Sequence, residues 1–370
     1  MIKVMQVSSD TNIGGAGKCI LTFLKFFSRD EFDVSVALPK GSLLSPLCLK
    51  EGVRVFEIDA MADKSMDFSA VSKLMRLFRA EKPDIVHAHA SMAAKIAAKL
   101  CGIKVVYTRH SVFEPPARLT HGIGKALSGA VNNFTADRII AVAEAAKDNL
   151  TKTGVSEKKI TVLLNGVEAL SPCGDEEKKK IRARFGISEG EKVVSIVARL
   201  NRVKGHKYFV RAAQILKDKG IGAKFVIAGT GDEEENIKSL IKELNLSDTV
   251  IMAGFLDNVS ELLNITDVQA NCSFGTEATS LSLLEGMSLG VPAVVTSFGG
   301  NPGVIKNGEN GFLVPVNNAE KMAEGIEKLL TDEELYEKMR KNCFKIYEEK
   351  FTSEVYTRNI ENVYKSLKQG

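Results

Sequence analysis

Two glutamates eight residues apart, Glu277 and Glu285, are the side chains best placed to do chemistry in this chain. Glu277 lies in a polar loop, whereas Glu285 falls in an apolar run whose leucines recur at helical spacing. The hydroxyls of Thr279 and Ser280 stand between them, at the expected start of the helix. Backbone N–H groups at a helix start have no partner within the helix and favour negative charge. The pattern therefore predicts a diphosphate on the helix start, with a carboxylate on either side to bind hydroxyl groups.

Two cations, Arg199 and Lys204, form a second candidate group. A strand is expected over 193–200, and Lys204 comes just before the next helix-length segment. Because ligands of open α/β folds bind at the carboxyl ends of the strands, both side chains are expected there. Two such cations can neutralise a nucleoside diphosphate as it leaves, in place of a metal ion. His206, just beyond, is expected to cap or pack the helix.

The first half of the chain contributes a histidine and a glycine-rich segment. His110 ends a strand expected over 104–110, where it can donate hydrogen bonds to a sugar hydroxyl or carbonyl. Gly14 and Gly15 follow the first strand and let the backbone approach a phosphate or sugar closely. A structural turn accounts for these glycines equally well.

Neither the other histidines nor the cysteines form a metal-site pattern. His87 and His89 share a strand face, but no acidic or thiol partner is near them in the sequence, so we interpret them as structural or acceptor-side residues. The six cysteines include no Cys-x-x-Cys pair and lie mostly in apolar or helical surroundings. We expect reduced core cysteines, and neither a disulfide framework nor a metal site.

Strand-like runs alternate with helix-length segments along the whole chain. Many runs are continuously apolar, which is typical of parallel strands covered by helices on both faces. The sequence therefore predicts two doubly wound α/β domains. The expected strands are 3–9, 33–39, 54–59, 85–90, 104–110, 138–144 and 160–166 in the first half, and 193–200, 224–230, 250–255, 268–273, 292–297 and 311–315 in the second.

The boundary between these domains is expected just after Asn165-Gly166-Val167, where a Pro- and Gly-containing stretch precedes the charged run 175–180. We interpret the charged run as the solvated start of a helix. A final amphipathic helix is expected from 351 through Leu367, with Thr352 or Ser353 as its N-cap.

Composition sets further limits. The chain has 370 residues, of which 44% are hydrophobic and 26% charged, which is typical of a globular protein with two domains. No apolar run approaches bilayer length and a strand pattern begins next to Met1, so we expect a cytoplasmic protein.

The net charge is +4, yet residues 69–125 hold ten basic residues against three acidic ones. This basic region is either a solvated helix face or a surface for an anionic membrane or a polyanionic acceptor.

The Glu277–Glu285 and Arg199–Lys204 spacings resemble the E-x7-E and R-x4-K elements of retaining glycosyltransferases of family 4. The Asn-Gly-Val element at 165–167 and the glycine-rich segment also resemble that family. The resemblance implies a GT-B fold, with two Rossmann-like domains facing each other across a cleft. It also implies that the last helix returns to the first domain. We therefore predict an acceptor-side domain of residues 1–168 plus 351–370 and a nucleotide-sugar-binding domain of residues 169–350.

The same resemblance implies roles for the candidate residues. Glu277 would bind the hydroxyls of the donor sugar, Arg199 and Lys204 the diphosphate, and His110 the sugar near its anomeric carbon. The implied activity is metal-independent transfer of a hexose-type sugar, with no cofactor, from a UDP- or GDP-linked donor to a lipid-linked, saccharide or small-molecule acceptor. No nucleic-acid partner is expected. The donor-binding set is Gly14, Gly15, Gly229, Gly254, Phe255, Thr279, Ser280 and Glu285, the last of these at the ribose.

The chain also departs from the family pattern. Ala278, Thr279 and Ser280 stand where glycines often follow the first glutamate, and Gly303 replaces a frequent glutamate after Gly-Gly-x-Pro. Any binding role at the latter place passes to Asn301 or is absent. Two alternatives stay open: a nucleotide-sugar 2-epimerase of the same fold, and a non-catalytic carbohydrate- or polyanion-binding scaffold.

Overall fold

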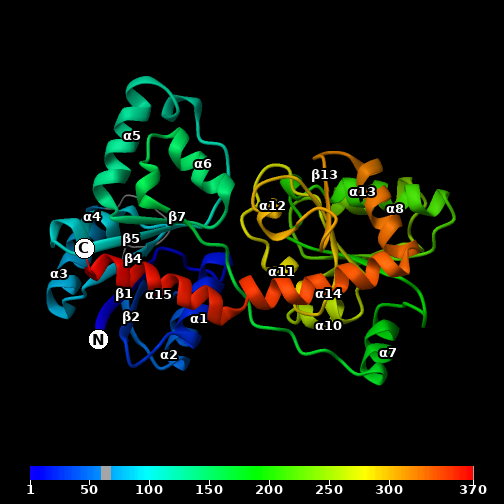
Figure 1. Cartoon of the computed structure of the whole chain (residues 1–370), viewed down its shortest axis with the longest axis horizontal. Coiled ribbons are helices and arrows are strands. Elements are labelled where there is room, and N and C mark those ends of the chain that lie inside the picture. The colour runs from blue at the N-terminus through cyan, green and yellow to red at the C-terminus, as the bar shows by residue number, and fades with distance from the viewer. Residues whose placement is uncertain (60–67, 370) are drawn as a thin grey trace. The chain divides into compact units, whose positions relative to one another are not determined.

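The computed structural model describes residues 1–59 and 68–369, which form two compact units (Figure 1). Unit 1 consists of Met1–Gly166 and Ser353–Gly370, and unit 2 consists of Val167–Thr352. Each unit is built on one parallel β-sheet with helices on both faces. The predicted fold class, two doubly wound α/β domains, is confirmed.

The sheet of unit 1 has seven strands in the order β3-β2-β1-β4-β5-β6-β7. Every neighbouring pair is parallel, for example Val4 of the first strand beside Val34 of the second and Ile85 of the fourth. The strands are β1 (Ile2–Ser8), β2 (Phe32–Pro39), β3 (Arg54–Ile58), β4 (Ile85–His89), β5 (Lys104–Arg109), β6 (Arg138–Ala141) and β7 (Ile160–Val162).

Two helices that lie far apart in the sequence cover one face of this sheet. The first helix and the C-terminal helix run side by side (Figure 1). Tyr364 of the latter packs its buried ring against Phe23 and Phe32. Glu361 accepts a hydrogen bond from the backbone N–H of Ser28 at 2.8 Å, which ties the C-terminal helix to unit 1. The helices of unit 1 are α1 (Gly15–Phe26), α2 (Ser45–Lys50), α3 (Phe68–Glu81), α4 (Met92–Leu100), α5 (Gly122–Thr135), α6 (Glu144–Lys152) and α15 (Ser353–Gln369), with single 3-10 turns at Ala117–Leu119 and Glu157–Lys159.

The sheet of unit 2 has six parallel strands in the order β10-β9-β8-β11-β12-β13. The strands are β8 (Val193–Val197), β9 (Lys224–Ala228), β10 (Val250–Gly254), β11 (Val268–Asn271), β12 (Ala293–Thr296) and β13 (Gly311–Val314). The helices are α7 (Asp175–Arg184), α8 (His206–Asp218), α9 (Glu234–Glu243), α10 (Val259–Asn264), α11 (Leu281–Met287), α12 (Asn301–Val304), α13 (Ala319–Thr331) and α14 (Glu333–Lys350), with a 3-10 turn at Arg202–Lys204. The main core lies between the sheet and α8, α9 and α13, and a second core on the other face includes residues of α7 and α10.

Both sheets reverse their strand order at one point, between β1 and β4 in unit 1 and between β8 and β11 in unit 2. Connections on the two sides of such a point run to opposite faces, so the loops after the two strands diverge and leave room for a ligand. The candidate residues follow these strands closely, although most strands end earlier than the sequence prediction, and two of these differences concern candidate residues. The strand expected to reach Arg199 ends at Val197, and the one expected to include His110 ends at Arg109.

Candidate functional site

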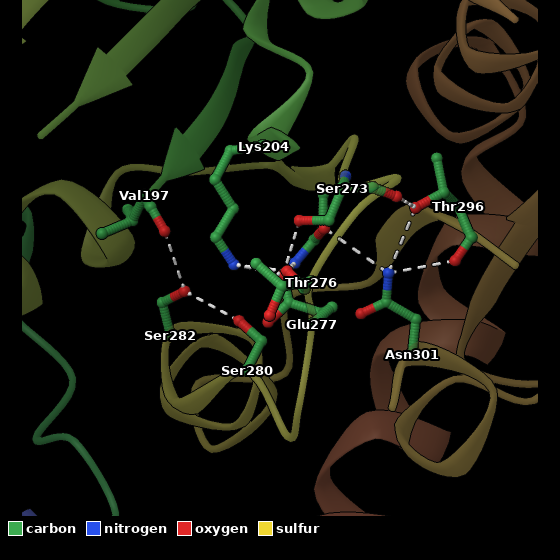
Figure 2. A network of polar contacts seen from close by, with 10 residues as sticks. Val197, Lys204, Ser273, Thr276, Glu277, Ser280, Ser282, Thr296 and Asn301 are labelled. Atoms are coloured by element: carbon green, nitrogen blue, oxygen red, sulfur yellow. Dashed lines mark hydrogen bonds and ion pairs between the residues drawn. The ribbon is translucent and has the colours of Figure 1, made fainter. Parts of the chain in front are cut away.

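The reversal point of unit 2 brings Lys204 and Glu277 together, although 73 residues separate them in the sequence. Lys204 ends the 3-10 turn that follows β8, and Glu277 lies in the loop between β11 and α11. The Lys204 Nζ atom lies 2.9 Å from Oε2 of Glu277, and both side chains are largely buried, with 19% and 7% of their surface exposed (Figure 2). The sequence placed the two residues in one site but did not predict that they form an ion pair.

Three side chains converge on a single oxygen of the Glu277 carboxylate (Figure 2). Oε2 accepts hydrogen bonds from Lys204 Nζ, from Asn271 Nδ2 at 3.0 Å and from Ser273 Oγ at 2.6 Å. Asn271 ends β11 and Ser273 follows it, so the strand end itself orients the carboxylate. Sequence analysis missed both residues, and their position at a strand end before an acidic loop residue was the only available signal.

The pair keeps unused hydrogen-bonding capacity. A lysine ammonium has three N–H donors, and two of those of Lys204 reach Glu277 Oε2 and the carbonyl oxygen of Thr276, at 3.2 Å. Among the described residues, none donates a hydrogen bond to Oε1 of Glu277, and none accepts from the third N–H of Lys204. The site therefore presents one carboxylate oxygen, suited to a hydroxyl group, beside one ammonium N–H, suited to an anionic oxygen.

A second layer of hydrogen bonds holds the Glu277 loop. Asn301 is fully buried, and its Nδ2 donates to the carbonyl oxygen of Thr296 at 3.0 Å and lies 3.4 Å from Asn271 Oδ1 (Figure 2). Thr296 Oγ1 in turn donates to the carbonyl oxygen of Ser273 at 2.6 Å. The Asn301 side chain thus supports the residues that hold Glu277 and is not presented to a ligand.

The ends of β8, β9 and β10 contact one another at the same edge of the sheet. The backbone N–H of Gly229, after β9, donates to the carbonyl oxygen of Gly254 at 2.7 Å. A Cβ atom at position 229, where φ is +141°, would lie 2.0 Å from the carbonyl oxygen of Ala198, so only glycine fits. Arg199 follows Ala198 and is exposed, and it makes no side-chain ion pair with any described residue. Phe255, after Gly254, leaves 70% of its surface exposed and so offers a free aromatic face at the strand ends.

The helix expected to carry the diphosphate is short. α11 has seven residues, and Ser280 precedes it without capping it through its side chain. Instead, Ser280 Oγ lies 3.2 Å from Ser282 Oγ, and Ser282 donates to the carbonyl oxygen of Val197 at the end of β8. Thr279 is buried, and Glu285 lies on α11 with partial exposure. These contacts fix the start of α11 against the same strand end that leads to Arg199.

The reversal point of unit 1 contains a chain of buried polar side chains that ends at His110. His89 Nδ1 lies 2.8 Å from His110 Nε2, and His89 Nε2 lies 3.0 Å from Oε1 of Gln6. With the Gln6 oxygen accepting, His89 donates from Nε2 and His110 donates from Nε2, which leaves Nδ1 of His110 as an acceptor. His87, interpreted from the sequence as structural or acceptor-side, is buried between Thr108 Oγ1 and the hydroxyl of Tyr364, each at 2.6 Å.

Burial keeps these histidines neutral. It lowers the pKa of His110 from 6.5 to about 4. The pKa of His87 is lowered to about 3, first by burial and then by the positive charge that His110 carries once it is protonated. The pKa of His89 falls well below the usual value for the same reason. His206, at the start of α8, is also buried, and burial beside Lys204 lowers its pKa to about 4. Above about pH 5, His110 therefore acts as a neutral hydrogen-bonding group.

Gly14 and Gly15 are open to a ligand. α1 begins at Gly15, earlier than the sequence suggested, with Gly14 as its N-cap residue. A Cβ atom at either position would meet nothing within 4 Å, so crowding inside unit 1 does not explain the glycines.

The basic region 69–125 is not one uniform surface. Lys95 is buried, and Lys99 forms a half-buried ion pair with Asp137 at 2.5 Å. Arg76, Arg79, Lys82, Lys104, Arg118 and Lys125 are exposed. No helix among the described residues is long and apolar enough to span a membrane.

Two family models match the chain, one in each half. The model described as glycosyltransferase family 4 matches residues 13–169, and the model described as glycosyl transferases group 1 matches residues 177–345. Together they leave only the termini and a short stretch between the halves unmatched.

Curated relatives and solved structures agree with these matches. N-acetyl-alpha-D-glucosaminyl L-malate synthase of Bacillus anthracis is 28% identical over 305 residues, which cover 80% of this chain and 78% of the relative. The UDP-Gal:alpha-D-GlcNAc-diphosphoundecaprenol alpha-1,3-galactosyltransferase of Escherichia coli is 27% identical over 362 residues, which cover 92% and 91%. A glycosyltransferase of Rickettsia africae superposes with a TM-score of 0.86 at 20% identity, covering 99% of this chain and 98% of that one. Anabaena HepE, solved with UDP, gives 0.85 at 20% identity, covering 99% and 100%. With both halves matched by family models and the fold shared along the whole length, the chain belongs to the group 1 glycosyltransferases of family 4, with the GT-B fold.

Proposed function

We propose that the protein transfers a hexose-type sugar from a nucleoside-diphosphate sugar to an acceptor hydroxyl, with retention at the anomeric carbon and without a metal ion. The observation that carries this proposal is the Lys204–Glu277 pair, in which one carboxylate oxygen and one ammonium N–H have no partner among residues 1–59 and 68–369. A nucleotide sugar has a hydroxyl-rich ring next to a diphosphate, so it matches both groups at once. Glu277 binds a hydroxyl of the sugar, and Lys204 binds the phosphate attached to the anomeric carbon.

Leaving-group stabilisation falls to Arg199 and Lys204. Negative charge grows on the diphosphate as the glycosidic bond breaks, and a preorganised cation lowers the energy of that state. The ion pair fixes Lys204 before the donor binds, whereas Arg199 is free to adjust to the outer phosphate. Because these two residues supply the charge that a divalent ion would otherwise supply, we expect no metal requirement.

Retention follows from a front-face reaction in this proposal. The acceptor hydroxyl attacks on the side from which the diphosphate leaves, and the departing phosphate oxygen takes the hydroxyl proton. Glu277 is committed to Lys204, Asn271 and Ser273 through Oε2 and acts as a hydrogen-bond acceptor, not as a nucleophile. The names of both relatives specify alpha products, as expected for retention from an alpha-linked donor.

The remaining roles follow the family pattern. We assign His110 to the donor sugar near its anomeric carbon, as a neutral group held by His89. Glu285 takes the ribose, and Phe255 with the strand ends at Gly229 and Gly254 takes the base.

The relatives support the substrate classes. The Escherichia coli relative is named for a UDP-sugar donor and a lipid-linked acceptor, the Bacillus anthracis relative for a small-molecule acceptor, and HepE was solved with UDP. We propose a UDP- or GDP-linked donor and an acceptor of the lipid-linked, saccharide or small-molecule class. The names of both relatives describe the formation of a glycosidic bond, which favours transfer over the epimerase and scaffold alternatives.

Binding of the donor is tested by thermal unfolding of the full chain with UDP, GDP and their sugars. A ligand at 100 times its Kd stabilises the folded state by about 2.7 kcal/mol. We expect such a shift for one nucleotide family, and its loss in the Arg199→Leu/Lys204→Met double variant at equal ligand concentration. Absence of a shift with every nucleotide and nucleotide sugar would contradict the proposal.

We further propose that the protein acts in the cytoplasm and contacts an anionic membrane surface peripherally. α5, next to the basic region, exposes Ile123, Leu127 and Phe134 by 87%, 64% and 75%, and helical geometry places these three side chains on one face. Apolar side chains beside exposed lysines and arginines suit an interface with anionic lipid.

Replacing Ile123, Leu127 and Phe134 with Ser should abolish co-sedimentation with phosphatidylglycerol vesicles, whereas Leu100→Ser, at an exposed leucine of α4, should not. Equal sedimentation of the triple variant and the wild type would refute this contact.

A further inference from the structure

Unit 1 contains a cavity of about 530 Å³ that the donor-binding roles do not explain. It extends from Ala16 in the glycine-rich segment, past His110, to side chains of α4 and α5. Its polar lining includes Lys95, Arg109 and Asn132, and the single carboxylate in its lining is that of Asp10.

Lys95 is the unusual member of this lining. It lies on α4 with only 1% of its surface exposed, among the buried alanines at 94, 97 and 98. Its Nζ donates to Oδ1 of Asn132 at 3.2 Å and lies 4.3 Å from the centre of the Tyr107 ring. Among the described residues no carboxylate forms an ion pair with Lys95, although Lys99, one turn further along α4, has Asp137.

A buried ammonium group without a counter-charge is costly, because removal from water must be offset by a pair or by several hydrogen bonds. One neutral amide oxygen and one aromatic face offset only part of that cost. Burial, and then the charge of Arg109, lowers the pKa of Lys95 from 10.5 to about 8, so the side chain still carries its charge near neutral pH. The structure thus holds a cation in place where no carboxylate among the described residues of unit 1 pairs with it.

Arg109 adds a second cation to the same cavity. Its Nε donates to the carbonyl oxygen of Ser111 at 3.3 Å, and its guanidinium lies 4.6 Å from the centre of the Phe113 ring. These contacts fix the orientation of the guanidinium plane. Among the described residues, no carboxylate forms an ion pair with Arg109. Two orienting contacts without a counter-ion are what a preformed anion site requires.

We propose that this cavity binds an anionic group of the acceptor, a carboxylate or a phosphate, between Lys95 and Arg109. The proposal rests on the transferase function above, because it assigns the cavity beside His110 to the acceptor. The anion supplies the counter-charge that Lys95 lacks, and the apolar lining from Phe113, Pro115 and Pro116 excludes water around it. A purely structural role for Lys95, as a stem packed on Tyr107, makes no use of the charge.

The proposal is tested by titrating the full chain with inorganic phosphate and with succinate, using erythritol as the neutral probe. Binding of UDP and of GDP is measured first, and the nucleotide that binds is then kept at saturating concentration to occupy the donor site. Lys95→Met removes the ammonium but keeps the unbranched stem. Lys125→Met serves as the control, because Lys125 is an exposed lysine of α5 outside the cavity lining.

We expect the wild type and Lys125→Met to bind phosphate or succinate equally, and Lys95→Met to bind at least about tenfold more weakly, since hydrogen bonds to charged groups are the strong ones. The probe that binds more tightly identifies phosphate or carboxylate as the acceptor group. Asn132→Asp provides an independent variant, because it places a carboxylate at the Lys95 ammonium and should displace the anion to a similar extent. Anion affinity that is unchanged in both variants, or absent from the wild type, would overturn the proposal. Failure of both UDP and GDP to bind would count against the transferase function instead, and the anion titrations would then be interpreted without a bound nucleotide.

Discussion

The Lys204–Glu277 pair makes a quantitative prediction about unit 2. Lys204→Met and Glu277→Gln each remove one charge while keeping a side chain of similar length. Lys204→Met leaves a carboxylate that is 7% exposed with only the neutral donors of Asn271 and Ser273. Glu277→Gln can turn its amide oxygen toward the same donors, but it leaves the ammonium without a counter-charge.

The expected coupling follows from distance and burial. Unit charges 4 Å apart attract by about 4 kcal/mol at an effective dielectric constant of 20, and desolvation of both groups offsets much of this. We expect each single variant to lower the unfolding free energy of unit 2 by about 3 kcal/mol. The double variant should lose less than the sum, which gives a coupling of about 1.5–3 kcal/mol.

Urea unfolding followed by far-UV circular dichroism measures these values, because the chain contains no Trp for fluorescence. Hydrogen exchange with mass spectrometry assigns the transition to unit 2. The matched control is Lys321–Glu324 on α13, a pair at 2.7 Å whose side chains are 52% and 47% exposed. Its coupling should stay below about 0.5 kcal/mol. A Lys204–Glu277 coupling as small as that of the control would refute the idea that burial strengthens this pair.

Three further predictions concern turnover, donor affinity and acid stability. Arg199→Leu should lower kcat by on the order of a hundredfold with an almost unchanged unfolding free energy, and near-normal kcat would remove Arg199 from the leaving group. Glu285→Gln should mainly raise the donor KM, by about tenfold, whereas Glu277→Gln should mainly lower kcat, and the opposite pattern would reverse their roles. Unfolding free energy should fall as the pH drops from 7 to 5, because the unfolded chain binds protons below about pH 6.5 while the folded histidines, with lowered pKa values, do not. Each such histidine contributes about 2 kcal/mol to this loss, so unit 1 should lose more than unit 2, and equal stability at both pH values would contradict the burial of these rings. Those histidines are His87, His89 and His110 in unit 1 and His206 in unit 2.

The fold could be predicted from sequence because parallel strands leave a local signal. Largely apolar runs such as 193–197 and 224–228 are found as β8 and β9, and the charged run 175–180 starts α7, as expected. The ends of the strands were harder to predict. Ala198 and His110 directly follow β8 and β5 and were included in the predicted strands, although the pairing with the neighbouring strand has already ended before them. The composition of a segment indicates whether it is buried, whereas the last paired residue of a strand depends on the strand beside it in the sheet.

The candidate site was only partly predictable, because its contacts join residues far apart in sequence. Glu277 and Lys204 were identified by spacing, yet their ion pair and the support from Asn271 depend on the order of β8 and β11 in the sheet. The inferred anion site was missed for a related reason. Lys95 stood in a basic region that looked like surface, and the alanines around it on α4 were the only sign that its stem is buried.

The central claim, metal-independent transfer with retention, is tested most directly by proton NMR of the purified full chain with a nucleotide sugar in excess chelator. Water then serves as the acceptor, and the anomeric proton of the released hexose reports the stereochemistry before mutarotation. Donors linked to UDP and GDP are compared, with the Arg199→Leu/Lys204→Met variant as the blank. We predict that one donor is consumed despite the chelator and that the alpha anomer appears first. Initial release of the beta anomer, or turnover only after magnesium or manganese is added, would contradict the account.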